Sequence, residues 1–245
     1  SDWMRPGTTA RVLVPAITWV SDIAAVLHAG LEPVFVDVAP ETLGMQWRDI
    51  APYSALAVFL THCLGFNALP TAMVKGPLYI EDCCEAPGAT MKGRKLGTFG
   101  WASNFSFYYA HHMTTVEGGM VCTDNPRLYQ MLRMLRSHGL VRESTDADLR
   151  SQAFDASPDL DPQFIFAMPA YNVRPTELNA VIGRSQLARL DANNARRTAN
   201  LTHFLALLDP AKYRTAYRLE GSSNYALPLV LREPNETLMQ RMLTT

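Results

Sequence analysis

Runs of consecutive apolar residues recur along the first half of the chain, and segments with helical spacing separate them. Val, Leu, Ile and Phe without polar alternation are typical of strands that are covered on both faces. The runs predict strands at residues 11–15, 33–37, 55–60, 78–82, 102–107 and 119–123. With helical segments such as residues 21–29 between them, they indicate an α/β fold whose mostly parallel sheet is flanked by helices.

Helical spacing dominates the second half of the chain. Residues 124–128 open a helix, because a capping side chain is followed there by proline. Residues 176–190 have strong helical periodicity, which we expect to continue to Leu208. The polar segment 144–161 shows no sustained period, and we predict that it is a long surface loop.

The segments 213–219 and 225–231 follow Pro210 and have the apolar character of short strands. We expect them to begin a smaller domain. The sequence therefore predicts a large domain over residues 1–208 and the start of a truncated C-terminal domain over residues 209–245.

Composition and charge exclude several classes of protein. Apolar residues make up 48% of the 245 residues, which is enough for a substantial core. The formal charge is −1, and the sequence has no cluster of Lys and Arg with interleaved aromatic residues of the kind that binds nucleic acid. No apolar stretch reaches the roughly 20 residues that a membrane span needs. Residues 1–6 lack the layout of a secretion signal, so we expect a cytoplasmic protein that acts on a small molecule.

The cysteines do not have the spacing of a metal site. They are Cys63, Cys83, Cys84 and Cys122, and the adjacent pair forms neither a zinc knuckle nor an easy disulfide. We predict buried, reduced thiols and no metal.

Motifs typical of one enzyme family occur at residues 15–19, 30–37, 81–90, 97–100, 104–119, 136–139 and 171–177. They follow the order in which the DegT/DnrJ/EryC1/StrS sugar aminotransferases carry them, and the chain resembles that family over most of residues 10–200. The resemblance implies fold type I of the pyridoxal-phosphate-dependent aminotransferases, with residues 1–208 as the coenzyme-binding domain.

One substitution changes the chemistry that the resemblance implies. In the family, the residue five positions after the strand serine is the lysine that holds pyridoxal phosphate, and here it is His111. An imidazole moves protons near neutral pH but has no primary amine to condense with an aldehyde. The resemblance then points to the 3-dehydratase branch. In this branch, pyridoxamine phosphate is the coenzyme that removes the C3 hydroxyl of a nucleotide-linked 4-keto-6-deoxyhexose. Glutamate then restores the amino group of the coenzyme. His111 would act as general base and then as general acid, whereas the neighbouring His112 would be structural.

The resemblance also assigns coenzyme contacts. Asp82 would pair with the pyridine nitrogen, Glu85 would contact the ring hydroxyl, and Ser106 would bind the phosphate. Trp19 would stack on the ring. Asn172 would reach the phosphate in the neighbouring subunit, which implies a homodimer with shared active sites.

His138 and Arg142 occupy positions near the substrate in similar 3-dehydratases. Both also follow a predicted helix end, where a cation interacts favourably with the helix dipole, so either role fits the sequence. The cysteines show no iron–sulfur cluster motif, although one related branch carries such a cluster.

Two other interpretations stay open at this point. The chain could be a non-catalytic binding or regulatory member of the family, or an aminotransferase in which the lysine was replaced by histidine. Relative to the family, we expect an amino-terminal Gly-Ser/Thr motif before Ser1 and most of the small domain after Thr245.

Overall fold

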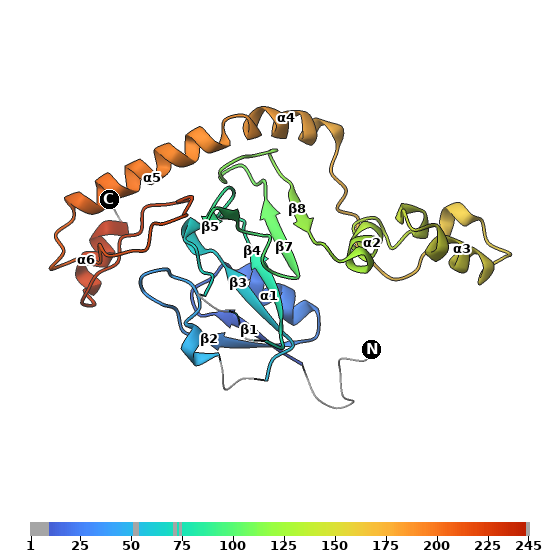
Figure 1. Ribbon diagram of the computed structural model, residues 1–245, viewed down its shortest axis with the longest axis horizontal. Helices are drawn as coiled ribbons and strands as arrows, with labels where there is room; N and C mark the ends of the chain where they lie inside the picture. The colour runs from blue at the N-terminus through green and yellow to red at the C-terminus, as the bar shows by residue number, and fades with distance from the viewer. Residues whose placement is uncertain (1–9, 51–53, 71–72, 74, 244–245) are drawn as a thin grey trace.

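A computed structural model describes residues 10–50, 54–70, 73 and 75–243 (Figure 1). The amino-terminal residues 1–6, for which the sequence predicts no secretion signal, lie outside the described residues. Among the described residues, no helix combines the length and the apolar character that crossing a membrane requires.

The main sheet confirms the predicted α/β architecture. Its strands lie in the order β2 (Glu32–Val36), β1 (Arg11–Pro15), β3 (Ala57–Thr61), β4 (Leu78–Asp82), β7 (Ala102–Ser106) and β8 (Gly119–Cys122). All neighbouring pairs are parallel except β7 and β8, which are antiparallel. A short antiparallel pair, β5 (Thr90–Met91) and β6 (Arg94–Lys95), lies outside this sheet.

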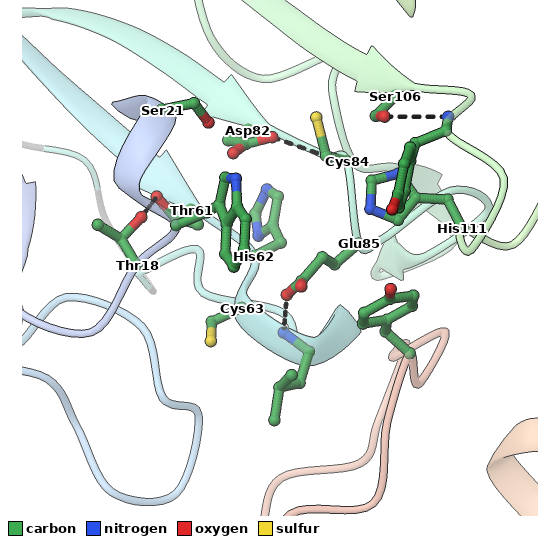
Figure 2. A pocket seen from close by; sticks show the side chains of 14 residues that line it. Thr18, Ser21, Thr61, His62, Cys63, Asp82, Cys84, Glu85, Ser106 and His111 are labelled. Atoms are coloured by element: carbon green, nitrogen blue, oxygen red, sulfur yellow. Dashed lines mark hydrogen bonds between the residues drawn. The ribbon is translucent and has the colours of Figure 1, made fainter. Parts of the chain in front are cut away.

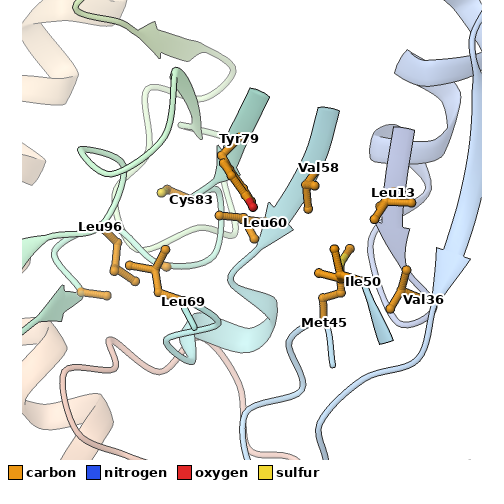
Figure 3. Close-up of a cluster of buried hydrophobic side chains, with 12 residues drawn as sticks. Leu13, Val36, Met45, Ile50, Val58, Leu60, Leu69, Tyr79, Cys83 and Leu96 are labelled. Atoms are coloured by element: carbon orange, nitrogen blue, oxygen red, sulfur yellow. The ribbon is translucent and has the colours of Figure 1, made fainter. Parts of the chain in front are cut away.

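The central strands are buried on both faces, as their continuous apolar runs predict. In β1, four consecutive residues from Val12 to Pro15 are buried, and β3 is similar. One face of the sheet packs on the largest apolar cluster (Figure 3), whose labelled members are Leu13, Val36, Met45, Ile50, Val58, Leu60, Leu69, Tyr79, Cys83 and Leu96. This core fixes the strands at whose carboxyl ends the candidate site lies.

The helices lie around and beyond the sheet (Figure 1). The α-helices are α1 (Val20–His28), α2 (Pro126–Leu135), α3 (Ala147–Asp155), α4 (Glu177–Leu187), α5 (Leu190–Leu207) and α6 (Glu236–Leu243). The 3-10 helices are η1 (Trp47–Asp49), η2 (Cys63–Gly65), η3 (Val141–Glu143) and η4 (Pro162–Phe164). The predicted start of α2 is confirmed, because the Asn125 side chain accepts a hydrogen bond from the Leu128 N–H at 2.9 Å.

The prediction of a continuous helix from residue 176 to 208 is nearly correct. The chain breaks it at Ala188 and Arg189, which separates α4 from α5. Helix α5 then packs through Leu201 and Leu205 against an apolar cluster that includes Phe66. The break turns the chain so that α5 reaches the part of the molecule near η2.

The prediction that residues 144–161 form a loop is wrong, because they contain α3. Asp146 caps this helix by accepting a hydrogen bond from the Leu149 N–H at 3.0 Å. None of the residues of α3 is buried. A helix without a buried face has no apolar periodicity, so the pattern that reveals other helices is missing here.

The strands predicted at 213–219 and 225–231 are also wrong. Both segments are fully described, and their ladder pairing is a single bridge between Tyr213 and Leu231. Beside the bridge, the Arg214 N–H donates to the Val230 carbonyl at 2.8 Å, and other backbone groups of the two segments bond to the larger part. The Tyr225 N–H donates to the Leu64 carbonyl at 2.9 Å, and the Arg218 N–H donates to the Glu41 carbonyl at 2.8 Å.

Candidate active site

A cavity of about 690 Å³ opens at the carboxyl ends of β3, β4 and β7. This is where open parallel sheets place their ligands. Four of the residues named from the sequence as coenzyme contacts, together with His111, line it (Figure 2); they are Trp19, Asp82, Glu85 and Ser106. Segments far apart in the chain thus meet in one cavity.

Asp82 ends β4 with its side chain almost fully buried. One carboxylate oxygen, Oδ1, accepts hydrogen bonds from the Cys84 N–H at 2.9 Å and from the Asn104 amide at 2.8 Å. These bonds fix the orientation of the carboxylate. A buried, oriented carboxylate is suited to bind a cationic nitrogen in the cavity.

Ser106 and His111 come from the end of β7 and the turn that follows it. The Ser106 Oγ accepts a hydrogen bond from the Tyr108 N–H at 3.2 Å, so its O–H can donate to a ligand. His111 is half-buried, and its Nδ1 atom is buried without a hydrogen-bond partner in the described part of the chain. Burial lowers the pKa of His111, so the imidazole is neutral near pH 7 and able to accept a proton.

His112 is adjacent to His111 but is held away from the cavity lining. Its Nε2–H donates to the backbone carbonyl of Ser223, and burial lowers its pKa to about 4. The separation of the two histidines does not come from strand alternation, because β7 ends at Ser106. His112 joins the segment around Ser223 to the turn that carries His111.

Trp19 and Glu85 also line the cavity. Trp19 is 70% exposed, so its ring has a free face. Glu85 Oε2 accepts a hydrogen bond from the Leu64 N–H at 2.6 Å. Burial raises the pKa of the Glu85 carboxyl, which favours the protonated acid over the carboxylate.

Asn172, His138 and Arg142 do not line this cavity, and all are exposed. Asn172 Oδ1 accepts a hydrogen bond from Arg174 at 3.0 Å. Arg142 donates to the backbone carbonyl of Gln163 at 3.1 Å. The contact of Asn172 with a neighbouring subunit and the substrate contacts of His138 and Arg142 stay predictions.

Tyr225 lines the cavity although no sequence motif points to it. Its ring lies edge-on to His111, with 5.3 Å between ring centroids. The Arg197 guanidinium on α5 donates to the Tyr225 carbonyl at 2.8 Å and holds the segment in place. An isolated tyrosine in an irregular segment gives no sequence signal, so only the docking of residues 221–225 identifies it.

Three buried side chains at the cavity, one of which (His62) lines it, resemble a metal-ligand set. Atoms of His62, Glu81 and Cys83 lie within 4.8 Å of one another. Glu81 already accepts three backbone hydrogen bonds from residues 97–100, and His62 Nδ1 accepts one from the Ala68 N–H. Burial raises the pKa of the Cys83 thiol, which stays protonated. These donors and acceptors stabilise the fold under Asp82.

Comparison with known families decides the relationship. The profile of the DegT/DnrJ/EryC1/StrS aminotransferase family matches residues 4–245. The chain belongs to this family. Among curated relatives in the family, the chain is similar to the GDP-4-keto-6-deoxy-D-mannose 3-dehydratases of Yersinia pseudotuberculosis and Escherichia coli O55:H7. The first is 32% identical over 91% of this chain and 59% of the relative, and the second is 30% identical over 88% and 57%.

Solved structures in the comparison share the fold. The E. coli GDP-4-keto-6-deoxy-D-mannose 3-dehydratase with bound hydrated pyridoxal phosphate is 24% identical, with a TM-score of 0.80 over 99% of this chain and 64% of that one. A GDP-4-keto-6-deoxymannose 3-dehydratase with bound GDP-perosamine is 24% identical, with a TM-score of 0.78 over 96% and 64%. The aminotransferase fold predicted from sequence is confirmed. The chain spans less than two thirds of the length of these relatives.

Proposed function

We propose that this member of the family binds pyridoxamine phosphate and belongs to a 3-dehydratase of a nucleotide-linked 4-keto-6-deoxyhexose. The observation that carries the proposal is the place of His111. A neutral imidazole lines the same cavity as Asp82 and Ser106. In the resemblance described above, His111 corresponds to the family's lysine. The 3-dehydratase relatives support the reaction class.

The residues of the cavity fit a pyridoxamine phosphate. Asp82 offers a buried carboxylate for the ring nitrogen, and Trp19 offers a free aromatic face for the ring. The Ser106 hydroxyl has its proton available for a phosphate oxygen. Burial raises the pKa of Glu85, and in its protonated form Glu85 would donate a hydrogen bond to the ring hydroxyl.

When bound, this coenzyme supplies an amine that condenses with the sugar's 4-keto group and a ring that accepts electrons. Asp82 would pair with the protonated ring nitrogen. His111 would serve as the base for the proton on the coenzyme carbon that carries the amine, and then as the acid that protonates the departing C3 hydroxyl. Its lowered pKa suits the first step, because the imidazole is unprotonated at neutral pH.

In this proposal, the exposed residues Asn172, His138 and Arg142 contribute to dimer assembly and substrate binding. Asn172 lies outside its own chain's cavity, which supports a homodimer in which it reaches the neighbouring coenzyme phosphate. His138 and Arg142 would contact the nucleotide sugar, and glutamate would restore the amine on the coenzyme. Residues 1–208 form the coenzyme-binding domain in this proposal, and residues 209–245 begin the smaller one.

Product analysis tests the reaction. The purified protein is incubated with pyridoxamine phosphate and GDP-4-keto-6-deoxymannose, and released ammonia and deoxy sugar are quantified. We expect equal amounts of both products, and we expect His111→Asn to lower the rate by at least about a hundredfold, the range of general acid–base catalysis. Absence of both products with the unaltered protein would favour the non-catalytic binding member.

A second variant tests the position of His111 without needing the reaction. In His111→Lys, a primary amine would stand beside the coenzyme aldehyde. We expect pyridoxal phosphate to become covalently bound at this residue, detected by peptide mass after borohydride reduction. His112→Lys is the matched control and should stay unmodified, because residue 112 points to the Ser223 carbonyl. Modification of neither lysine would place His111 away from the aldehyde carbon.

A further inference from the structure

Residues 221–225 form a short segment at the side of the cavity, which we call the strap. The chain after α5 returns toward β5 (Figure 1), where the Thr90 N–H donates to the Gly221 carbonyl at 2.7 Å. The strap carries Tyr225, which lines the cavity. It has no helix or strand of its own, so contacts with other elements must hold it in place.

Backbone contacts dock the strap on η2. The Ser223 N–H donates to the Gly65 carbonyl at 3.0 Å, and the Tyr225 N–H donates to the Leu64 carbonyl at 2.9 Å. A Cβ atom on Gly65 would lie 2.8 Å from the Glu85 carbonyl oxygen and 2.9 Å from that of Ser223. A side chain at Gly65 would therefore push the two backbones apart, and glycine permits their close approach.

His112 fastens the strap to the turn that carries His111. Its side chain is buried, and its Nε2–H donates to the Ser223 carbonyl. The Tyr225 ring lies beside both histidines, with 5.8 Å between ring centroids to His112 and 5.3 Å to His111. The strap thus connects a histidine that the mechanism above does not use with the one that it does.

We propose that His112 is a positioning residue for His111. By holding the Ser223 carbonyl, His112 keeps the Tyr225 ring against the edge of the His111 imidazole. This contact restricts rotation of the imidazole and keeps water from that edge, and a general base must be held in reach of its proton. The inference rests on the proposed function, because it takes His111 to be the base.

The surroundings of His111 support this role. Burial lowers the pKa of His111, and the carbonyl of Ser106 and the charge of Asp82 on β4 oppose that effect. Tyr108, in the same turn, and Tyr225, on the strap, both contact the ring, with centroids at 5.7 and 5.3 Å. Because Tyr225 supplies part of the burial, release of the strap should hydrate His111 and raise its pKa.

Two amide variants of His112 test the role of the Nε2–H bond in the coenzyme-free protein. The glutamine amide in His112→Gln reaches about as far as Nε2, whereas the asparagine amide in His112→Asn reaches only the position of Nδ1. We expect His112→Asn to speed hydrogen exchange of the Ser223 and Tyr225 N–H groups at least about threefold, because one hydrogen bond of the strap is lost. His112→Gln should keep the exchange rates of the unaltered protein. Equal acceleration in β1 would overturn the inference, because the change would then be global.

The pKa of His111, measured by NMR of its ring in the same samples, tests the link to the base. It should rise in His112→Asn and in Tyr225→Leu and stay unchanged in His112→Gln. Since His112 acts through Tyr225, adding His112→Asn to Tyr225→Leu should change it little further. An unchanged pKa in Tyr225→Leu, or additive effects in the double variant, would overturn the inference. If His112→Asn does not fold, Tyr225→Leu still decides.

Turnover tests the consequence for the proposed reaction. We expect His112→Asn to lower kcat at least about fivefold with KM within about twofold, because orientation of the base is lost while the binding contacts remain. His112→Gln should restore most of kcat. An unaltered kcat in His112→Asn would refute positioning. The exchange and pKa measurements need neither coenzyme nor substrate, so failure of this inference is distinct from failure of the proposed dehydration.

Discussion

Replacement of Glu81 by glutamine removes the charge that organises the backbone beneath the cavity. The Glu81 side chain is fully buried. Oε1 accepts hydrogen bonds from the N–H groups of Phe99 and Gly100, both at 2.6 Å. Oε2 accepts one from Gly97 N–H at 2.7 Å and faces His62 Nε2 at 3.4 Å. Since Glu81 directly precedes Asp82, the same group also supports the candidate site.

The magnitude follows from the number of donors that a glutamine leaves without an acceptor. Its oxygen can replace only one carboxylate oxygen, and its amide would point N–H groups at Gly97 N–H and His62 Nε2–H. His62 cannot change tautomer without loss, because its Nδ1 accepts from the Ala68 N–H at 3.2 Å. Each hydrogen bond to a charged group contributes about 1.5–3 kcal/mol, and glutamine leaves two of the four donors without an acceptor. We therefore expect Glu81→Gln to destabilise the protein by about 3–5 kcal/mol.

Urea unfolding and thermal unfolding at pH 7.5 measure this loss. For a chain of this size, the loss corresponds to a fall of about 6–20 °C in the midpoint. Glu32→Gln is the matched control, because its ion pair with Arg11 is half-exposed and should contribute less than about 1 kcal/mol. A loss below about 1 kcal/mol in Glu81→Gln would refute this account of the buried carboxylate.

The pH dependence supplies a second check on the same variant. Burial alone would raise the pKa of Glu81, but the hydrogen bonds from His62 and from the N–H groups of Gly97 and Gly100 outweigh it and lower the pKa. A lowered folded pKa contributes stability that is present above the unfolded pKa of about 4.3 and is lost as pH falls through the folded pKa. The difference between Glu81→Gln and the unaltered protein should therefore shrink in acid and stay constant from pH 6 to 8.

Three further variants test the cavity and the fold. Glu85→Gln should bind pyridoxamine phosphate up to about fivefold more tightly at pH 8, because an amide donates without first taking up a proton; weaker binding in an equilibrium titration would contradict this. Tyr225→Leu should remove the edge contact between Tyr225 and the His111 ring. We expect this variant to turn over more slowly with little change in coenzyme affinity, whereas Tyr225→Phe should keep the turnover of the unaltered protein. Leu201 is on the buried side of α5, and Leu201→Ala should lower the free energy of unfolding in urea by about 2–5 kcal/mol. Leu207 is 71% exposed on the same helix, so Leu207→Ala should lower it by less than about 0.5 kcal/mol. Equal losses would show that α5 is not anchored by its buried face.

The pattern of apolar residues was sufficient to predict most strands of the sheet. The strand predicted at residues 78–82 is β4 with the same bounds, and the one at 11–15 is β1. These strands are buried on both faces, so their apolar runs are continuous and their ends are marked by polar residues. The pattern failed for α3, which buries no residue, and for residues 213–231, where the pairing is limited to the bridge between Tyr213 and Leu231.

The sequence by itself determined the family and the residues around the coenzyme position, because motif residues such as Asp82 and His111 have fixed spacing from strand ends. Only the tertiary structure places the Tyr225 ring beside His111 and the N–H groups of residues 97–100 around Glu81. The residues that Tyr225 and Glu81 contact are distant in the chain, so the sequence around each of them does not identify these partners. The protonation and orientation of these side chains depend on burial and on nearby charges. Both arise only when the strands and the segment around Tyr225 have come together.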